Sequence, residues 1–281
     1  MSLGEWFTKE AIKELWQNKG QLWAKISAWF SKEDDPRKIL IIGPGGVGKT
    51  TLACFLAGAP DPSSTQFVTE YIESINVESY DIDGEPKGQL VVLPGQPERM
   101  DATWPQLLDA VKAGEFRGIV LVLAYGHHSI GDFSYKNHKL YSKEEGLEGF
   151  VEKYLEFCRK DEERILEKLC DSIRQCESQI WLISLVTKQD LWWDDRDAVE
   201  SHYSTGKYRN IISKCMGGKA THEFRHEPVY TSLVIRNLMT GRNETLKSTI
   251  AGYDQSHQRQ SLEKLLHTFE GLMAWEKKNG N

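Results

Sequence analysis

The sequence predicts an α/β protein built on a mostly parallel sheet of about six strands, with one antiparallel edge strand and helices on both faces. Three observations lead to this fold class. A glycine-rich loop at 43–50 stands between an apolar run and a helix-compatible run. Residues 118–124 and 180–186 are continuous apolar runs, as in strands that a parallel sheet buries on both faces. Helical patterns alternate with these strands, and the turn Asp83-Gly84 indicates one hairpin.

Residues 1–35 form a segment that we separate from this sheet. Residues 5–30 carry apolar side chains at three-, four- and seven-residue spacings, including four of the nine tryptophans, and predict an amphipathic helix that a polar hinge follows. The apolar face of this helix has three candidate neighbours: its own domain, the groove of a partner protein, or a membrane surface. Residues 36–281 are predicted to form one domain.

Strands and helices alternate within that domain. Strands are expected at 39–42, 69–81, 89–93, 118–124, 180–186 and 229–235, and helices at 51–57, 100–113, 150–176, 195–216 and 261–275. Three segments look inserted between these elements, near 125–180, 203–228 and 236–254. Long insertions of this kind carry partner contacts or are passive.

The loop Gly43-Pro44-Gly45-Gly46-Val47-Gly48-Lys49-Thr50 matches the phosphate-loop pattern G-x-x-x-x-G-K-[ST], with a strand before it and a helix after it. Its glycines allow backbone turns that a Cβ would forbid, so that successive N–H groups can point at a polyphosphate. The helix that follows the loop, from Thr51 onward, adds the positive end of its dipole. Lys49 is expected to bind the β- and γ-phosphates, and the Thr50 hydroxyl to ligate Mg²⁺.

Composition narrows the class of protein. The formal net charge of −6 argues against a general nucleic-acid binder, whose binding surface is basic. Five cysteines are an odd number without C-x-x-C spacing, so neither a disulfide framework nor a cysteine metal site is predicted. No apolar run reaches the roughly 18 residues of a membrane span. We expect a cytoplasmic protein, with peripheral membrane binding as one role open to the N-terminal helix.

The motif Thr187-Lys188-Gln189-Asp190 directly follows the buried run at 180–186, where ligands of such sheets bind. The Asp190 carboxylate can accept hydrogen bonds from the N1–H and the exocyclic amine of guanine, whereas adenine presents an acceptor at N1. The stem of Lys188 can lie along the base plane. These residues predict a preference for guanine.

Taken together, these motifs give residues 37–275 a resemblance to the Ras-like small GTPases. Thr187–Asp190 is similar to the family's N-K-x-D guanine motif, with Thr in place of Asn. Tyr230-Thr231-Ser232-Leu233 is similar to the last motif of the family, which implies that the backbone N–H groups of Ser232 and Leu233 contact the guanine carbonyl. The resemblance implies GTP, GDP and Mg²⁺ as the ligands.

The stretch Leu93-Pro94-Gly95-Gln96 is similar to the second switch, D-x-x-G-Q. The resemblance implies that the Gly95 N–H binds the γ-phosphate and that Gln96 orients the attacking water. Thr69 has the spacing of the first-switch Thr that closes over Mg²⁺, and three neighbouring hydroxyl residues compete with it: Ser63, Ser64 and Thr65.

One position departs from the family pattern. The Asp that begins the second switch falls at Val92, where there is no carboxylate. Three consequences are open: slow hydrolysis that needs a partner's arginine finger, replacement by another carboxylate such as Glu70 or Glu98, or a domain that binds nucleotide without turning it over.

Three other groups of residues stand out in the sequence. His127 and His128 are interpreted as surface residues of a loop, rather than as ligands or catalytic groups. The charge cluster at 160–164 is interpreted as a solvated helix face. The pair Trp192-Trp193 is expected to pack or to form an interaction surface.

The resemblance implies a molecular switch that binds GTP and hydrolyses it, with Lys49 and Gln96 as its catalytic residues. Its output would pass through an unidentified protein effector or regulator, and no nucleic-acid partner is expected. A non-hydrolysing nucleotide-dependent scaffold is the alternative from another class, and an ATP-using P-loop enzyme is a third hypothesis.

Overall fold

The computed structural model describes residues 38–56, 77–82, 88–95, 97–217, 219–220 and 222–279. The predicted N-terminal helix, the Asp83-Gly84 turn, Thr69 and Gln96 lie outside these residues. The main sheet has six strands in the described part of the chain: β1 (Lys38–Ile42), β2 (Glu78–Ile82), β3 (Gly88–Val92), β4 (Phe116–Leu123), β5 (Ile180–Val186) and β6 (Phe224–Tyr230).

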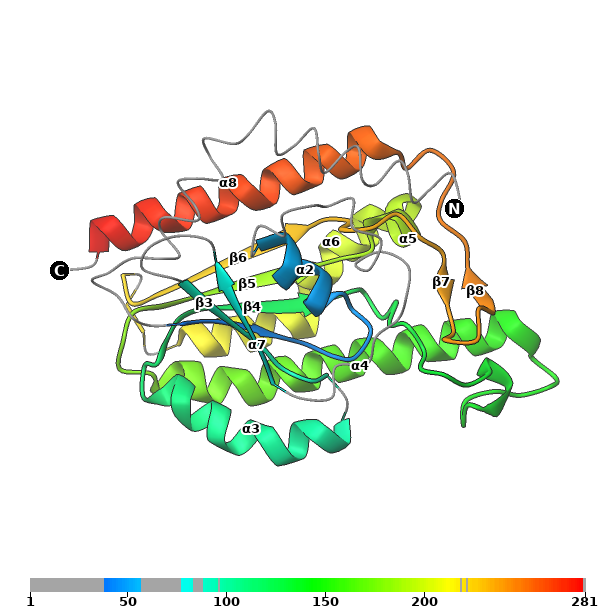
Figure 1. The fold of residues 1–281 in the computed structure, drawn as a ribbon, viewed down its shortest axis with the longest axis horizontal. Coiled ribbons are helices and arrows are strands. Elements are labelled where there is room, and N and C mark those ends of the chain that lie inside the picture. The colour runs from blue at the N-terminus through cyan, green and yellow to red at the C-terminus, as the bar shows by residue number, and fades with distance from the viewer. Residues whose placement is uncertain are drawn as a thin grey trace.

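These strands lie in the order β2-β3-β1-β4-β5-β6 (Figure 1). β2 runs antiparallel to β3, and all other neighbours in the sheet are parallel. The strand order reverses at β1, and open α/β sheets bind ligands at the carboxyl ends of strands near such a point. The predicted fold class is confirmed in the sheet, which is mostly parallel with one antiparallel edge strand.

Helices cover both faces of this sheet (Figure 1). α2 (Lys49–Leu56) and α8 (Gln255–Asn279) pack on one face, and α3 (Pro97–Lys112), α4 (Gly146–Gln175), α6 (Arg196–Ser204) and α7 (Gly206–Met216) pack on the other. Successive side chains of a strand point to opposite faces of the sheet. Ile39 and Ile41 of β1 therefore belong to the core beneath α2 and α8, whereas Leu40 and Ile42 belong to the core on the opposite face. β4 and β5 are buried along their whole length, as their continuous apolar runs predicted.

Two predicted elements differ from the structure. The residues expected as one helix, 195–216, begin in the short η3 (Trp193–Asp195) and then form α6 and α7, which separate at Gly206. Gly206 has a φ of +59°, a conformation that glycine adopts at low cost. The last strand of the sheet is β6 rather than 229–235, because an edge strand is only partly buried and lacks a continuous apolar run.

Two of the segments interpreted as inserted fold against each other near the start of α4 (Figure 1). The later one contains a two-stranded sheet of β7 (Leu238–Met239) and β8 (Thr245–Lys247), and the short helix α5 (Gln189–Trp192) follows β5 outside both segments. Between β7 and β8, the Glu244 carboxylate accepts hydrogen bonds from Ser134 Oγ (2.8 Å) and Tyr135 N (3.1 Å), which begins the short η2 (Tyr135–Asn137). A small apolar cluster joins them: Ile130, Phe150, Tyr154, Cys158, Leu191, Leu238 and Leu246.

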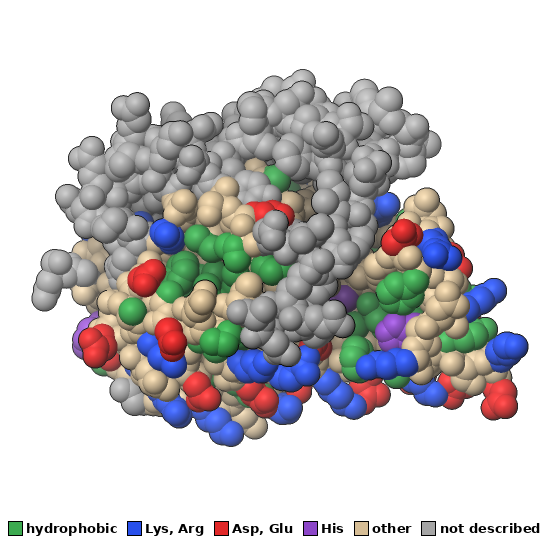
Figure 2. Space-filling view, turned by 60° about the horizontal axis from the view of Figure 1, so that its bottom comes forward, with side chains coloured by type: hydrophobic (Ala, Val, Ile, Leu, Met, Phe, Trp, Pro, Cys, Tyr) green, Lys and Arg blue, Asp and Glu red, His purple; other side chains and the backbone are tan. Residues whose placement is uncertain are grey.

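The outer side of α4 carries ion pairs. Lys160 lies 2.6 Å from Glu156, and Lys207 of α7 lies 3.0 Å from Glu163. Figure 2 shows acidic and basic side chains interspersed along this side of the molecule. Among the helices described, none combines the length and the apolar character that crossing a membrane requires.

Candidate nucleotide site

The phosphate loop leaves the carboxyl end of β1 and leads into α2. Gly43 has a φ of +151°, and a Cβ on it would lie 2.1 Å from the carbonyl oxygen of Val122 in β4. Gly46 has a φ of +70°, and its Cβ would lie 2.7 Å from the backbone N and O atoms of Ser129. Both positions therefore require glycine, and the path of the loop depends on β4 and on the segment that follows β4.

Lys49 is the first residue of α2 and is buried, and its Nζ donates a 2.7 Å hydrogen bond to the carbonyl oxygen of Pro44. Burial lowers the pKa of Lys49 to about 7, against the opposite effect of the Glu78 carboxylate. A Cβ on Gly95 would lie 2.4 Å from Lys49 Nζ, so these two residues are in close contact. The structure therefore brings together the two described residues that were expected at the γ-phosphate.

Val92, the position of the missing Asp, is 1% exposed and belongs to the apolar core between the sheet and α2. It lies directly opposite Glu78 in the antiparallel pair of β2 and β3. Residues that face each other in this way lie on the same side of a sheet. Glu78 is thus a carboxylate near the phosphate loop that the sequence did not indicate, whereas the side chains of Glu70 and Glu98 lie outside the described residues.

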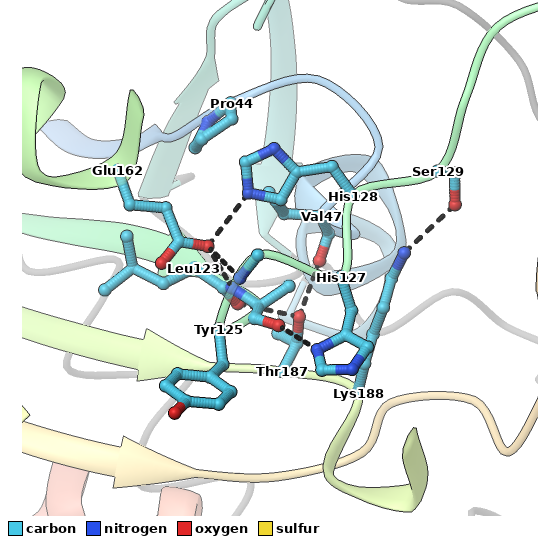
Figure 3. Close-up of polar contacts among 12 residues, drawn as sticks. Pro44, Val47, Leu123, Tyr125, His127, His128, Ser129, Glu162, Thr187 and Lys188 are labelled. Atoms are coloured by element: carbon cyan, nitrogen blue, oxygen red, sulfur yellow. Dashed lines mark hydrogen bonds and ion pairs between the residues drawn. The ribbon is translucent and has the colours of Figure 1, made fainter. Parts of the chain in front are cut away.

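Thr187 joins the proposed guanine motif to the phosphate loop (Figure 3). Its Oγ1 lies 2.7 Å from the carbonyl oxygen of Val47 and 2.9 Å from that of Leu123, and both oxygens can accept its hydroxyl proton. The Thr187 side chain is buried at the end of β5. Although Thr is shorter than the Asn of the family motif, it reaches the loop directly.

Lys188 follows Thr187 in a left-handed backbone conformation, with a φ of +58°. Its Nζ donates a 3.0 Å hydrogen bond to Ser129 Oγ (Figure 3). The N–H of Ser129 donates to the Gly46 carbonyl oxygen at 3.2 Å. Burial lowers the pKa of Lys188 to about 8, against the opposite effect of nearby Asp190. The stem of Lys188 thus extends from the guanine motif toward the phosphate loop.

The Asp190 carboxylate is fully buried at the start of α5. Its Oδ1 accepts a hydrogen bond from the Ser232 hydroxyl, and its Oδ2 accepts one from the backbone N–H of Arg236 at 3.0 Å. Burial raises the pKa of Asp190 to about 6, against the effect of the hydrogen bond from Ser232. The next residue of the last motif, Leu233, accepts a 3.1 Å hydrogen bond from Gln258 Nε2 at its carbonyl oxygen.

The interpretation of His127 and His128 as surface residues is wrong, because they are only 1% and 5% exposed. His127 contacts the Ala124 carbonyl oxygen through Nδ1 at 3.0 Å and Lys247 Nζ through Nε2 at 3.2 Å. His128 Nε2 lies 2.9 Å from Glu162 Oε1 (Figure 3). Both histidines are therefore held by other side chains or backbone groups beneath the phosphate loop.

The interpretation of residues 160–164 as a solvated face is also wrong at Glu162, which is fully buried on α4. A signal for this was present in the sequence. Glu162 lies four residues after Cys158 and four before Leu166, and both of these belong to the apolar side of α4. A carboxylate on the apolar side of a helix needs buried hydrogen-bond donors.

In the part of the chain that the structure describes, no three His, Cys, Asp or Glu side chains are arranged to hold a metal ion. The site instead offers the Thr50 hydroxyl, at the start of α2, next to the loop that would bind phosphate oxygens. Mg²⁺ prefers oxygen ligands and is commonly bound by few protein groups together with substrate phosphates. The available donors therefore fit this ion.

No protein-family model matches this sequence, and no curated protein matches it. A search of solved structures finds the ADP-ribosylation factor-like GTP-binding protein, small COPII coat GTPase SAR1, of Encephalitozoon cuniculi in complex with GDP. It shares 16% identity with a TM-score of 0.39, over 93% of this chain and 92% of that chain. The GDP form of the signal recognition particle receptor SRb of Chaetomium thermophilum shares 16% identity with a TM-score of 0.38, over 71% of this chain and 90% of that chain. Because these values are low, the functional assignment depends on the geometry of this chain.

Proposed function

We propose that this chain is a guanine-nucleotide-binding molecular switch that binds GTP and GDP with Mg²⁺ and hydrolyses GTP, slowly or with the help of a partner protein. The observation that carries the proposal is the buried Asp190 carboxylate at the carboxyl end of β5. Three residues before it, Thr187 bonds to the phosphate loop at Val47. A group that can select guanine and a loop that can bind polyphosphate thus belong to one hydrogen-bonded unit.

Each loop residue has a role in this proposal. Lys49 would exchange its bond to Pro44 for phosphate oxygens, and the N–H groups from Gly45 to Thr51 would bind the polyphosphate, since Pro44 has no N–H to donate. The N–H of Gly95 would bind the γ-phosphate, and Gln96 would orient a water for in-line attack. Mg²⁺, held by Thr50, would supply positive charge at the β- and γ-phosphates.

The base preference can be tested with fluorescent analogues of GDP and ADP. The wild-type protein should bind the GDP analogue much more tightly than the ADP analogue. Asp190→Asn should weaken GDP binding about 100-fold, because an amide group cannot accept both guanine N–H bonds and its own donor would face them. If Asp190→Asn leaves the preference between the two nucleotides unchanged, the assignment of guanine fails. Lys49→Ala serves as the control that loses both nucleotides.

The second candidate is a non-hydrolysing scaffold that recruits protein partners when nucleotide binds. The observation in its favour is Val92, which fills the position of a metal-shell carboxylate with a buried apolar side chain. Phosphate release from GTP with Mg²⁺, compared among wild type, Gln96→Leu and Lys49→Ala, separates the two functions. If wild-type turnover equals that of Lys49→Ala, the hydrolase is refuted.

The partner side of the switch is also a proposal. An effector or regulator would read the switch loops, as such proteins act by ordering and releasing loops. The N-terminal segment is the candidate contact with a partner groove or a membrane surface. Liposome pelleting of the full chain and of a variant that lacks residues 1–30 tests the membrane role, which is refuted if the two pellet equally.

A further inference from the structure

The feature that carries a further inference is the buried carboxylate of Glu162 on α4. Its Oε1 accepts hydrogen bonds from the backbone N–H groups of Ala124 (2.8 Å) and Gly126 (3.1 Å) and contacts His128 Nε2 at 2.9 Å. Its Oε2 accepts a bond from the Tyr203 hydroxyl at 2.8 Å. A fully buried carboxylate lowers stability unless such partners surround it. Three of the four contacts are to residues 124–128, which form one turn, and the fourth is to Tyr203, which also contacts that turn.

The charges of the pair are consistent with an ion pair at neutral pH. Burial alone would lower the pKa of His128, but Cys158 and Glu162 beside it raise that pKa to about 9. Burial alone would raise the pKa of Glu162, but its hydrogen bonds with His128 and with the Ala124 backbone lower it. The imidazolium and the carboxylate therefore stabilise each other in a buried site.

The turn that Glu162 holds has an unfavourable backbone. Tyr125 has a φ of +50°, which is uncommon for a residue other than glycine, and Gly126 has a φ of +80°. A Cβ on Gly126 would lie 2.2 Å from the carbonyl oxygen of Leu155 on α4. The Tyr125 N–H donates to the Tyr203 hydroxyl at 3.1 Å, so Glu162 and Tyr203 together support both residues that have a positive φ.

The turn is hydrogen-bonded to the phosphate loop. One residue after His128, the Ser129 N–H bonds to the Gly46 carbonyl oxygen, and Ser129 Oγ accepts the bond from Lys188 Nζ. On its other side, the turn is held by the contact between His127 and Lys247 of β8. The position of Gly46 and Lys188 therefore depends on a turn that α4 fixes through Glu162.

We propose that Glu162 and His128 are positioning residues for the nucleotide site: they hold the turn 124–129 against the phosphate loop and so raise nucleotide affinity without contributing to the loop itself. This inference rests on the proposed function. The chain provides a matched control in a second buried ion pair, between Arg117 at the start of β4 and Glu276 near the end of α8. That pair lies at the amino ends of the parallel strands, away from the phosphate loop.

The test compares Glu162→Gln with Glu276→Gln, because both substitutions remove one buried charge from an ion pair. Binding and dissociation of a fluorescent GDP analogue are measured with Mg²⁺, and hydrogen exchange is followed in the peptide that spans residues 39–56. Glu162→Gln should weaken GDP binding at least tenfold, mainly through faster dissociation, and should speed exchange in that peptide. Glu276→Gln should change the affinity less than twofold and leave exchange there unchanged.

Two outcomes overturn the inference: Glu162→Gln binds GDP within twofold of wild type, or both variants lose affinity equally. If Glu162→Gln does not fold, Tyr203→Phe decides, since it removes one donor to Glu162 and the acceptor for Tyr125 while retaining the ring. It should weaken GDP binding at least threefold, and wild-type affinity in this variant contradicts the inference. If the wild-type protein binds no GDP, the proposed function has failed instead.

Discussion

Thr187→Val tests whether the bond between the guanine motif and the phosphate loop supports nucleotide binding. Valine has almost the same shape as threonine but no hydroxyl, so the substitution removes the bonds at 2.7 Å and 2.9 Å without leaving a cavity. The Leu123 carbonyl oxygen keeps the backbone N–H of residue 187 as a donor at 2.8 Å. Among the hydrogen bonds described, the Val47 carbonyl oxygen therefore loses its donor, whereas the Leu123 carbonyl oxygen retains one.

A buried acceptor that loses its hydrogen bond costs about 1–3 kcal/mol. We expect the free energy of unfolding of Thr187→Val to fall by about that amount in urea titrations followed by tryptophan fluorescence. If the loop moves to expose the Val47 carbonyl oxygen to water, part of this energy is lost from nucleotide binding, and a loss of about 1.4 kcal/mol is a tenfold weaker affinity for GDP.

Thr187→Ser is the matched control because it retains the hydroxyl, and Thr187→Asn restores the side chain of the family motif. Both should bind GDP more tightly than Thr187→Val. The reasoning is refuted if the Val and Ser variants have the same stability and the same affinity for GDP, since the hydroxyl would then contribute to neither.

Three further outcomes are expected. Glu276→Ala should lower the free energy of unfolding by about 3–5 kcal/mol, because it removes the buried carboxylate that pairs with Arg117 and accepts a hydrogen bond from Trp181 Nε1; a loss below about 1 kcal/mol in urea titrations would contradict this. GDP affinity should fall as pH rises from 7 to 8, by at most tenfold per pH unit. The reason is that the pKa of Lys49 in the free protein is about 7 and phosphate binds the protonated form of this lysine. Lys49→Arg should remove the dependence of GDP affinity on pH in this range. Glu78→Gln should move the fall in affinity to lower pH, because the Glu78 carboxylate raises the pKa of Lys49; an unchanged profile would mean that this carboxylate does not act on Lys49.

Local sequence patterns were sufficient to predict most strands of the sheet and the phosphate loop. The parallel strands β4 and β5 are continuous apolar runs, and the loop residues 43–50 need their glycines for backbone reasons that act within a few residues. The last strand was predicted five residues too late, at 229–235 rather than Phe224–Tyr230, because the residues of β6 at the edge of the sheet are mostly polar and only partly buried. An apolar pattern cannot locate a strand that has only one neighbour.

The turn at 124–129 shows why the rest of the site could not be predicted. His128 finds its partner Glu162 34 residues away in the sequence, and His127 finds Lys247 120 residues away. Two adjacent histidines are ordinary in a surface loop, and only the packing of α4 and of the β7–β8 segment buries them. The same is true of Glu78, whose place opposite Val92 depends on the register of β2 and β3.

The burial of Asp190, the residue proposed to select the base, has a measurable consequence for the preference between GDP and ADP. It raises the pKa of Asp190 to about 6, so the carboxylate is ionised above that pH and protonated below it. Guanine N–H donors favour the ionised form, whereas adenine offers no such donor at N1. The ratio of GDP to ADP affinity should therefore rise as pH increases from 5 to 7. Any effect on the phosphates is common to both nucleotides and cancels in the ratio, so a ratio that stays constant from pH 5 to 7 would contradict Asp190 as the group that selects the base.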